Sequence, residues 1–160
     1  MDRKRFDTLV RDTQEPLRRF LCALCCGDSA LADDIAQESY IKAYLSIDGL
    51  RDRAAFAPWL YRIAYNMFLS RRRTVRDTVP VDEARAVVAD DSADAAFRYQ
   101  GLHAALAALG DAERTAILLF YMEDRPVKEI AAITGDTEGT IRQRLSRGRV
   151  RLHDLLQKQK

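Results

Sequence analysis

The sequence predicts an all-α protein made of two small helical domains that a flexible linker joins. Three observations predict this fold class. Apolar residues recur at intervals of three and four over most of the chain, which is the spacing of one buried helix face. No strand hairpin or internal repeat is recognisable. The stretch from about Thr74 to Ala95 keeps no helical or strand period and contains Pro80, six acids and mostly short side chains. We therefore expect domains at residues 1–75 and 97–160 and an acidic linker at 76–96.

Three helices are expected before the linker. The first carries helically spaced apolar residues from Phe6 to Leu24. The second covers 31–47, with Asp28 or Ser29 as its N-cap. The third runs from Phe56 to about Arg73, and it tolerates Pro58 because the first turn of a helix needs no N–H donor there.

The third helix interleaves aromatic and cationic side chains. Spacing predicts that one stripe is buried, and this stripe consists of Phe56, Leu60, Ile63 and Met67. The remaining aromatics and arginines suit single-stranded DNA, because bases stack on rings while guanidinium groups hold phosphates. Some of these aromatics could equally belong to the core, and for Trp59 the two alternatives are balanced. Tyr65, Asn66 and the basic end of the helix are the stronger candidates for DNA contact.

Four helices are expected after the linker. Two of them, at 97–109 and 112–121, are separated at Gly110-Asp111. The segment 126–152 then has the layout of a helix-turn-helix. In that segment Gly135 occupies the position of a left-handed helix end, and Asp136 or Thr137 can cap the following helix.

The last helix is strongly basic on one face. Ile141, Leu145, Gly148 and Leu152 form its apolar or small face, and no acid lies between residues 139 and 153. A solvated surface helix normally mixes both charge signs, so this bias favours binding to phosphate. Arginines near a helix end also complement the helix dipole, and this alternative would explain the last arginines but not those in the first turns.

The composition and motifs argue against a membrane-spanning protein, a secreted protein and an enzyme. The 160 residues carry a net charge of +2, and no run of about eighteen apolar residues or signal-peptide pattern is present. We therefore expect a cytoplasmic protein. No nucleophile motif or phosphate-binding glycine loop occurs, so no enzyme activity and no cofactor are expected.

The cysteines form a CxxCC run, Cys22, Cys25 and Cys26, within the first expected helix. A zinc site needs about four ligands, and both histidines lie in the other domain, so no metal is expected. Reduced thiols packed in the helix are the preferred interpretation, and a thiol switch stays open as the alternative.

Three separated stretches resemble one family. DDIAQESYIKAY (33–44) resembles the helix by which bacterial sigma factors bind RNA polymerase. FAPWLYRIAYNMFLSRRR (56–73) resembles their promoter-melting helix, and EIAAITGDTEGTIRQRLSRGRVRL (129–152) resembles their −35 reader. The short length and the two-domain plan are similar to the extracytoplasmic-function (ECF, group 4) sigma factors.

This resemblance implies a sigma2-like helical bundle followed by a sigma4-like helix-turn-helix domain. It implies a subunit that binds core RNA polymerase at the β′ clamp helices and the β flap, recognises −35 and −10 promoter elements, and assists melting without catalysing a reaction. An anti-sigma factor is a further expected partner, whereas a small-molecule substrate is not.

The resemblance and the side-chain chemistry together select three groups of candidate residues. For polymerase binding they are Asp33, Asp34, Gln37, Glu38 and Lys42. For the −35 element they are Lys128, Thr140, Arg142, Gln143, Arg144, Ser146, Arg147 and Arg149. For the −10 element they are Arg51, Arg53, Trp59, Arg62, Tyr65, Asn66, Arg71 and Arg72. Within the last group, Arg51 and Arg53 lie in the loop 48–55, which resembles the family's pocket for a flipped base.

Two alternatives remain open. A conventional helix-turn-helix regulator would use the N-terminal domain to sense a ligand or to dimerise, and an enzyme would centre on the cysteines. One departure from the family pattern is Pro126, which replaces the usual capping hydroxyl and leaves the start of its helix undecided.

Overall fold

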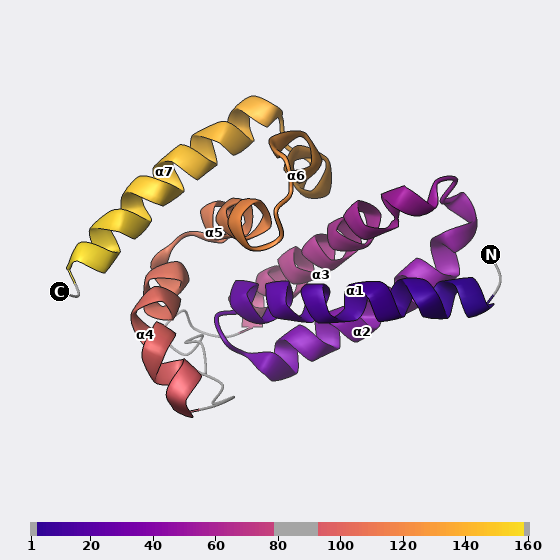
Figure 1. Cartoon of the computed structure of the whole chain (residues 1–160), viewed down its shortest axis with the longest axis horizontal. Helices are drawn as coiled ribbons and strands as arrows, with labels where there is room; N and C mark the ends of the chain where they lie inside the picture. The colour runs from indigo at the N-terminus through magenta and orange to yellow at the C-terminus, as the bar shows by residue number, and fades with distance from the viewer. Residues whose placement is uncertain (1–2, 79–92, 159–160) are drawn as a thin grey trace.

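The computed structural model describes residues 3–78 and 93–158, with side chains described for 3–74 and 101–158. Within these ranges the chain forms seven α-helices joined by short turns, and no strand (Figure 1). The prediction of an all-α fold is confirmed. None of the helices in these ranges combines the length and the apolar character that crossing a membrane requires.

The N-terminal lobe is a bundle of α1 (Arg3–Leu24), α2 (Ser29–Ser46) and α3 (Phe56–Thr78). The three helices lie side by side, with α2 packed on both α1 and α3 (Figure 1). Their apolar faces pack against one another, which removes large side chains from water and stabilises the bundle. The most completely buried of these residues are Leu17, Phe20, Leu21, Leu24, Ile35, Leu60 and Phe68.

The turn between α1 and α2 resolves the choice of cap and corrects the placement of the cysteines. The Asp28 Oδ1 atom accepts a hydrogen bond from the Leu31 N–H at 3.1 Å, so Asp28 is the N-cap of α2. Helix α1 ends at Leu24 because Cys26 and Gly27 have φ angles of 57° and 90°. Cys25 and Cys26 therefore lie in the turn and not within the helix, contrary to the prediction.

Two short 3₁₀ turns, η1 (Ile47–Gly49) and η2 (Arg53–Ala55), connect α2 to α3. Helix α3 begins at Phe56, as predicted, and Phe56 and Leu60 are buried. Ile63 and Met67 are only half-buried, so the prediction of the buried stripe is wrong at these two positions. A second set of α3 side chains is buried instead, namely Tyr61, Ala64, Tyr65 and Phe68.

The C-terminal lobe contains α4 (Ala93–Ala108), α5 (Asp111–Ile117), a π-helical turn η4 (Leu118–Met122), α6 (Val127–Thr134) and α7 (Glu138–Gln157). Helix α3 runs to Thr78 and α4 starts at Ala93, so both extend into the segment predicted as a linker. The rest of that segment, 79–92, lies outside the described residues. The division into domains at 75 and 97 stays a prediction.

The turn between α6 and α7 has the geometry of a helix-turn-helix. Gly135 has a φ angle of 79° and closes α6, and the Thr137 Oγ1 atom accepts from the Thr140 N–H at 3.1 Å to cap α7. At the other end of α6, the Pro126 carbonyl accepts from Glu129 and Ile130 N–H groups at 3.0 Å each. Helix α6 thus starts at Val127 without a capping hydroxyl.

Helix α7 packs on α5 through its small and apolar face. Ile141 and Leu145 are buried, and Leu152 is half-buried, which confirms the predicted face. At Gly148 a Cβ atom would lie 3.0 Å from Ile117 Cγ1 and 3.2 Å from Ile117 Cδ1. The absence of a side chain at Gly148 is therefore what allows the two helices to approach each other.

A Gly148→Val substitution is expected to destabilise the protein by about 1–3 kcal/mol, because the branched side chain overpacks against Ile117. The measurement is the free energy of unfolding in urea. Gly139→Ala is the matched control in the same helix, where the nearest atom to a Cβ is 4.0 Å away. This control should be neutral or stabilising, since alanine favours a helix over glycine. Equal unfolding free energies for the Gly148→Val variant and the unaltered protein would contradict the packing argument.

Candidate nucleic-acid and polymerase interfaces

The basic face of α7 is open to solvent. Helix α7 packs on α5 and α6 through its opposite face, which leaves Arg142, Gln143, Ser146, Arg147 and Arg149 exposed. Thr140 is half-buried near the cap, and Lys128 is exposed on α6. These are the positions from which the second helix of a helix-turn-helix reaches base edges and phosphates.

Some arginines of this face have partners within the lobe. Arg144 is half-buried and pairs with Asp136, so its head group is held against the start of the helix. Arg149 Nη1 donates to the Tyr121 hydroxyl at 3.0 Å. Arg142 lies 3.8 Å from Glu138 and is largely exposed, so this pair costs little to break.

The predicted polymerase face of α2 is mostly exposed. Asp34, Gln37 and Lys42 are exposed. Asp33 pairs with Arg18 at 3.0 Å, and Glu38 pairs with Arg71 of α3. Two predicted contact residues, one from the polymerase group and one from the −10 group, thus bind each other here.

The sequence interpretation missed an apolar component of this face. Ile41, Tyr44 and Leu45 are large hydrophobic residues that are exposed on α2. Tyr44 and Leu45 follow Ile41 by three and four residues, so these three apolar side chains lie on one side of the helix. Gln37 precedes Ile41 by four residues and lies on the same side. This spacing in the sequence could have revealed the apolar strip. An exposed apolar strip beside polar side chains is typical of a protein-binding surface.

The predicted −10 residues divide into two sets. Arg51 and Arg53 are exposed in the loop before α3, and Asn66 is exposed on α3 itself. Trp59 is half-buried, with its ring centroid 6.0 Å from that of Phe56. The remaining members, apart from Arg71, contact the C-terminal lobe.

Tyr65 corrects the expectation of an accessible ring, since it is only 5% exposed. Burial raises the pKa of its hydroxyl, and of the nearby charges Arg144 lowers that pKa whereas Asp136 and Asp111 raise it. All three charges belong to the C-terminal lobe. That lobe therefore covers the Tyr65 ring, which cannot stack on a base in this arrangement.

Two predicted −10 arginines also bind the C-terminal lobe. Arg62 Nη1 donates to the Ala132 carbonyl oxygen of α6 at 3.3 Å. Arg72 Nε lies 3.5 Å from Asp111 Oδ2, and its guanidinium carbon is 5.2 Å from the centroid of the Phe68 ring. Together with Tyr65 they form the side of α3 that meets the C-terminal lobe, where Arg62 stays exposed to solvent.

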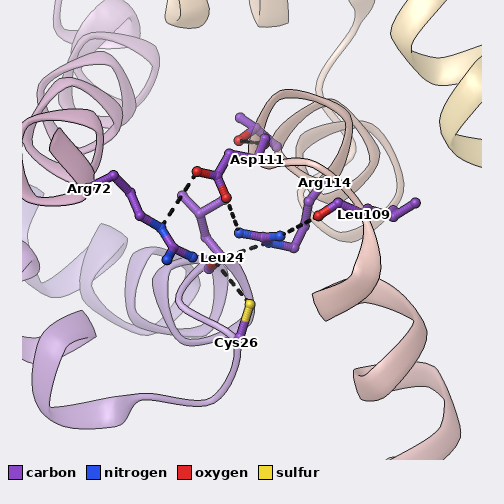
Figure 2. Close-up of polar contacts among 7 residues, drawn as sticks. Leu24, Cys26, Arg72, Leu109, Asp111 and Arg114 are labelled. Carbon is purple, nitrogen blue, oxygen red and sulfur yellow. Dashed lines mark hydrogen bonds and ion pairs between the residues drawn. The ribbon is translucent and has the colours of Figure 1, made fainter. Parts of the chain in front are cut away.

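Arg114 of α5 is the most deeply buried charge between the lobes, at 1% exposure. Its Nε donates to the Leu24 carbonyl at 3.1 Å, its Nη1 to the Leu109 carbonyl at 2.9 Å, and its Nη2 to Asp111 Oδ1 at 2.6 Å. Figure 2 shows the guanidinium aimed at Leu24, while Arg72 approaches Asp111 from α3. Asp111 thus binds one arginine from each lobe.

Glu123 forms a second polar contact between the lobes. Its side chain is 3% exposed, its Oε2 accepts from the Tyr61 hydroxyl at 3.0 Å, and its Oε1 lies 3.6 Å from Arg19 Nη2. Arg125 places its guanidinium carbon 5.2 Å from the Tyr61 ring centroid. Burial, and then the charge of Glu123, raise the pKa of Tyr61, so its hydroxyl stays protonated and donates.

The backbone after α5 presents Glu123 to the N-terminal lobe. The π-helical turn η4 contacts α1, and the Glu123 N–H donates to the Leu118 carbonyl at 3.1 Å. Asp124 then has a φ angle of 55°, a left-handed conformation that aspartate tolerates better than most residues. The chain reverses there, and Glu123 and Arg125 both reach Tyr61.

Comparisons with known proteins agree on one family. The Sigma-70 region 2 family matches residues 9–78, and the Sigma-70 region 4 family matches residues 99–152. The ECF RNA polymerase sigma factor SigW of Bacillus subtilis is 30% identical over 85% of this chain and 81% of its own length. SigE of Mycolicibacterium smegmatis, also an ECF sigma factor, is 32% identical over 96% of this chain, which spans 62% of that protein.

A solved structure has the same arrangement of helices. The sigma factor RpoE of Bartonella quintana, in complex with the anti-sigma factor NepR, superposes with a TM-score of 0.75 at 28% identity. The match covers 95% of this chain and 96% of that one.

The three cysteines lie around the end of α1 and are reduced. Cys25 is buried, whereas Cys22 and Cys26 are half-buried, and the Cys26 Sγ atom lies 3.9 Å from the Leu24 carbonyl that also binds Arg114 (Figure 2). In the part of the chain that the structure describes, no group of three or more His, Cys, Asp or Glu residues is placed to hold a metal ion. Burial raises the pKa of the Cys25 thiol to about 12.

Cys25 is expected to react with iodoacetamide more slowly than Cys22 and Cys26 at pH 9, because the attacking species is the thiolate and burial keeps Cys25 protonated. Timed alkylation followed by peptide mass spectrometry measures the three rates. Repeating the labelling in 8 M urea is the control, in which Cys25 should lose its protection. Equal rates in the folded protein would contradict the burial of this thiol.

Proposed function

Because the chain belongs to the ECF sigma factors of RNA polymerase, we propose that it binds core polymerase and directs it to promoters with −35 and −10 elements. The observation that carries this proposal is the exposed face of α7, which is basic and free of acids from residue 139 to 153. A helix-turn-helix with this face is suited to the major groove. The chain supplies recognition, and the polymerase supplies the chemistry.

Recognition of the −35 element falls to the first turns of α7. Arg142 and Gln143 can pair with guanine and adenine edges, and Ser146 can contact either. Arg147 and Arg149 lie farther along the helix, where phosphates are closer. Arg144 acts through its pair with Asp136, which fixes the helix start, and Lys128 of α6 and Thr140 lie at the edges of the same surface.

Polymerase binding is assigned to α2. The strip of Ile41, Tyr44 and Leu45 provides apolar area, and Asp34, Gln37 and Lys42 provide polar contacts around it. This combination fits a protein surface better than DNA, because Asp34 would repel phosphates. The clamp helices of the β′ subunit are the proposed partner of α2, and the β flap is the proposed partner of the C-terminal lobe.

Recognition of the −10 element is assigned to α3 and the loop before it. Arg51, Arg53 and Asn66 are exposed and can bind an opened strand directly. Tyr65 and Arg72 can join them only when the C-terminal lobe moves away from α3. Arg62 is exposed, and only its hydrogen bond to the Ala132 carbonyl has to break. Trp59 and Arg71 complete the proposed surface at its margins.

An anti-sigma factor is the other proposed partner. The similar RpoE of Bartonella quintana was solved in complex with the anti-sigma factor NepR, and the chain superposes on that RpoE over nearly its whole length. We place the protein in the cytoplasm, where bacterial RNA polymerase works.

The test is transcription in vitro with purified bacterial core RNA polymerase and fragmented genomic DNA as template. New transcripts, mapped by sequencing their 5′ ends, should begin downstream of a shared pair of sequence elements only when the chain is added. A chain that binds duplex DNA tightly by itself and restores no initiation would instead be a conventional helix-turn-helix regulator.

Two substitutions on α7 separate reading bases from holding phosphates. Arg142→Ala is expected to cost about 1–3 kcal/mol at the promoter found above and to relax preference at one base pair. Arg147→Ala is expected to weaken binding to every duplex and to reduce the slope of affinity against salt concentration. Binding of the holoenzyme to single-base variants of the promoter, at several salt concentrations, measures both effects. If Arg142→Ala lowers affinity for all variants equally, its base-reading role is wrong.

A further inference from the structure

A groove lies between α1 and the start of α3, and it is here called the α1–α3 groove. Its volume is about 270 Å³, and its floor is apolar, since Leu9, Pro16, Phe56, Ala57 and Tyr61 line it. A drug-sized ligand usually occupies a pocket of about 300–1,000 Å³, so this groove suits a smaller group, such as a single nucleobase.

Arginines border the α1–α3 groove. Arg53 and Arg125 line it directly, and Arg5 precedes Leu9 by four residues, so it lies on the same face of α1 one turn nearer the N-terminus. Arg5 and Arg53 are exposed, whereas Arg125 is half-buried and pairs with Glu129 at 2.8 Å. Two solvent-facing guanidinium groups thus lie beside an apolar hollow, and such groups bind phosphates well.

Aromatic packing fixes the position of this basic turn. The Phe6 ring centroid lies 5.1 Å from that of Tyr44 and 6.3 Å from that of Phe56, which holds the first turns of α1 against the end of α2 and the start of α3 (Figure 1). The first turn of α1 contains no acid and carries Arg5 and two further cations. Cations at a helix N-terminus oppose the helix dipole, so helix stability does not explain them.

Asp12 indicates which partner fits the groove. It is exposed and also lines the groove, where its carboxylate can accept a hydrogen bond from the amino group of a base such as cytosine. An acidic protein segment would be repelled by Asp12. Bases of a duplex are stacked and paired, so they cannot enter the hollow without being extruded. A single strand supplies an accessible base, amino groups and phosphates together.

We propose that the α1–α3 groove binds single-stranded DNA, with one base in the hollow and neighbouring phosphates on Arg5 and Arg53. The inference rests on the proposed function of the loop before α3. Arg53 belongs both to that loop and to the groove, so a strand that leaves the −10 surface passes next to α1. Tyr61 and Asn66 are five residues apart on α3, which puts the groove on a different side of the helix from Asn66.

The experiment is ultraviolet cross-linking of the full-length chain to a mixed-sequence 12-nucleotide single strand that carries 5-iododeoxyuridine, with the cross-linked peptides identified by mass spectrometry. Cross-links should fall in segments 9–16 and 53–57. Ala54→Leu should lower their yield about fivefold, because the longer side chain fills the hollow that receives the base. Ala55→Leu is the matched control, since Ala55 is exposed beside Ala54 and does not line the groove.

A second measurement tests the phosphate contact of Arg5. Arg5→Ala should reduce the slope of log affinity against log salt concentration by about 0.7, the value for one phosphate of a single strand. Fluorescence anisotropy of the same oligonucleotide, labelled with fluorescein, gives this slope. Arg11→Ala is the control, because Arg11 is exposed on α1 but six residues from Arg5 and on another face, and it should leave the slope unchanged.

Absence of cross-links from both segments, or equal slopes for the Arg5→Ala and Arg11→Ala variants, would overturn the inference. If Arg5→Ala weakens binding to core polymerase but not to the single strand, the partner of this face is a protein and the inference is also wrong. A chain whose groove binds no strand but which restores initiation keeps the promoter-directing function. A chain that binds the strand in the groove and restores no initiation loses that function instead.

Discussion

The buried guanidinium of Arg114 is the constraint around which the two lobes are arranged. A charge that is 1% exposed is unfavourable unless its donors are satisfied, and one of its three acceptors, the Leu24 carbonyl, belongs to the other lobe. That carbonyl is available because α1 ends at Leu24 and Cys26 turns the chain away. The end of α1 in the N-terminal lobe thus accepts a hydrogen bond from Arg114, whose other two acceptors lie in the C-terminal lobe.

Helix α3 packs against other helices on two sides, and this explains why it is apolar on one side and aromatic and cationic on the other. One side packs on α1 and α2 through residues such as Leu60 and Phe68, and the other packs on α6. The second side is aromatic and cationic, and the C-terminal lobe meets it with Glu123, Asp111 and the Ala132 carbonyl. These polar contacts lie beside a hydrophobic core that is continuous across both lobes.

Local signals in the sequence were sufficient for the existence of the helices and for some of their ends. Asp28, Gly135 and Thr137 act at single positions through their own side chains or φ angles, and each does so here. The burial of Tyr65 could not be predicted in the same way, because an aromatic residue among arginines fits a nucleobase and an acidic protein surface equally well. The cysteines were misplaced for a related reason, since helical spacing alone does not show where α1 ends.

The chemistry of arginine explains why a surface for DNA and a surface for an acidic protein segment look alike in the sequence. Arginine binds phosphate, carboxylate and carbonyl oxygens with similar geometry, so a surface built for DNA is also complementary to acids from elsewhere in the chain. A free chain with an exposed −10 surface would bind unrelated nucleic acids through its charge alone. Contacts such as Asp111 with Arg72 remove part of that charge while leaving α7 exposed. Selectivity for promoters would then depend on the bases that α7 reads, because contacts between arginine and phosphate carry no sequence information.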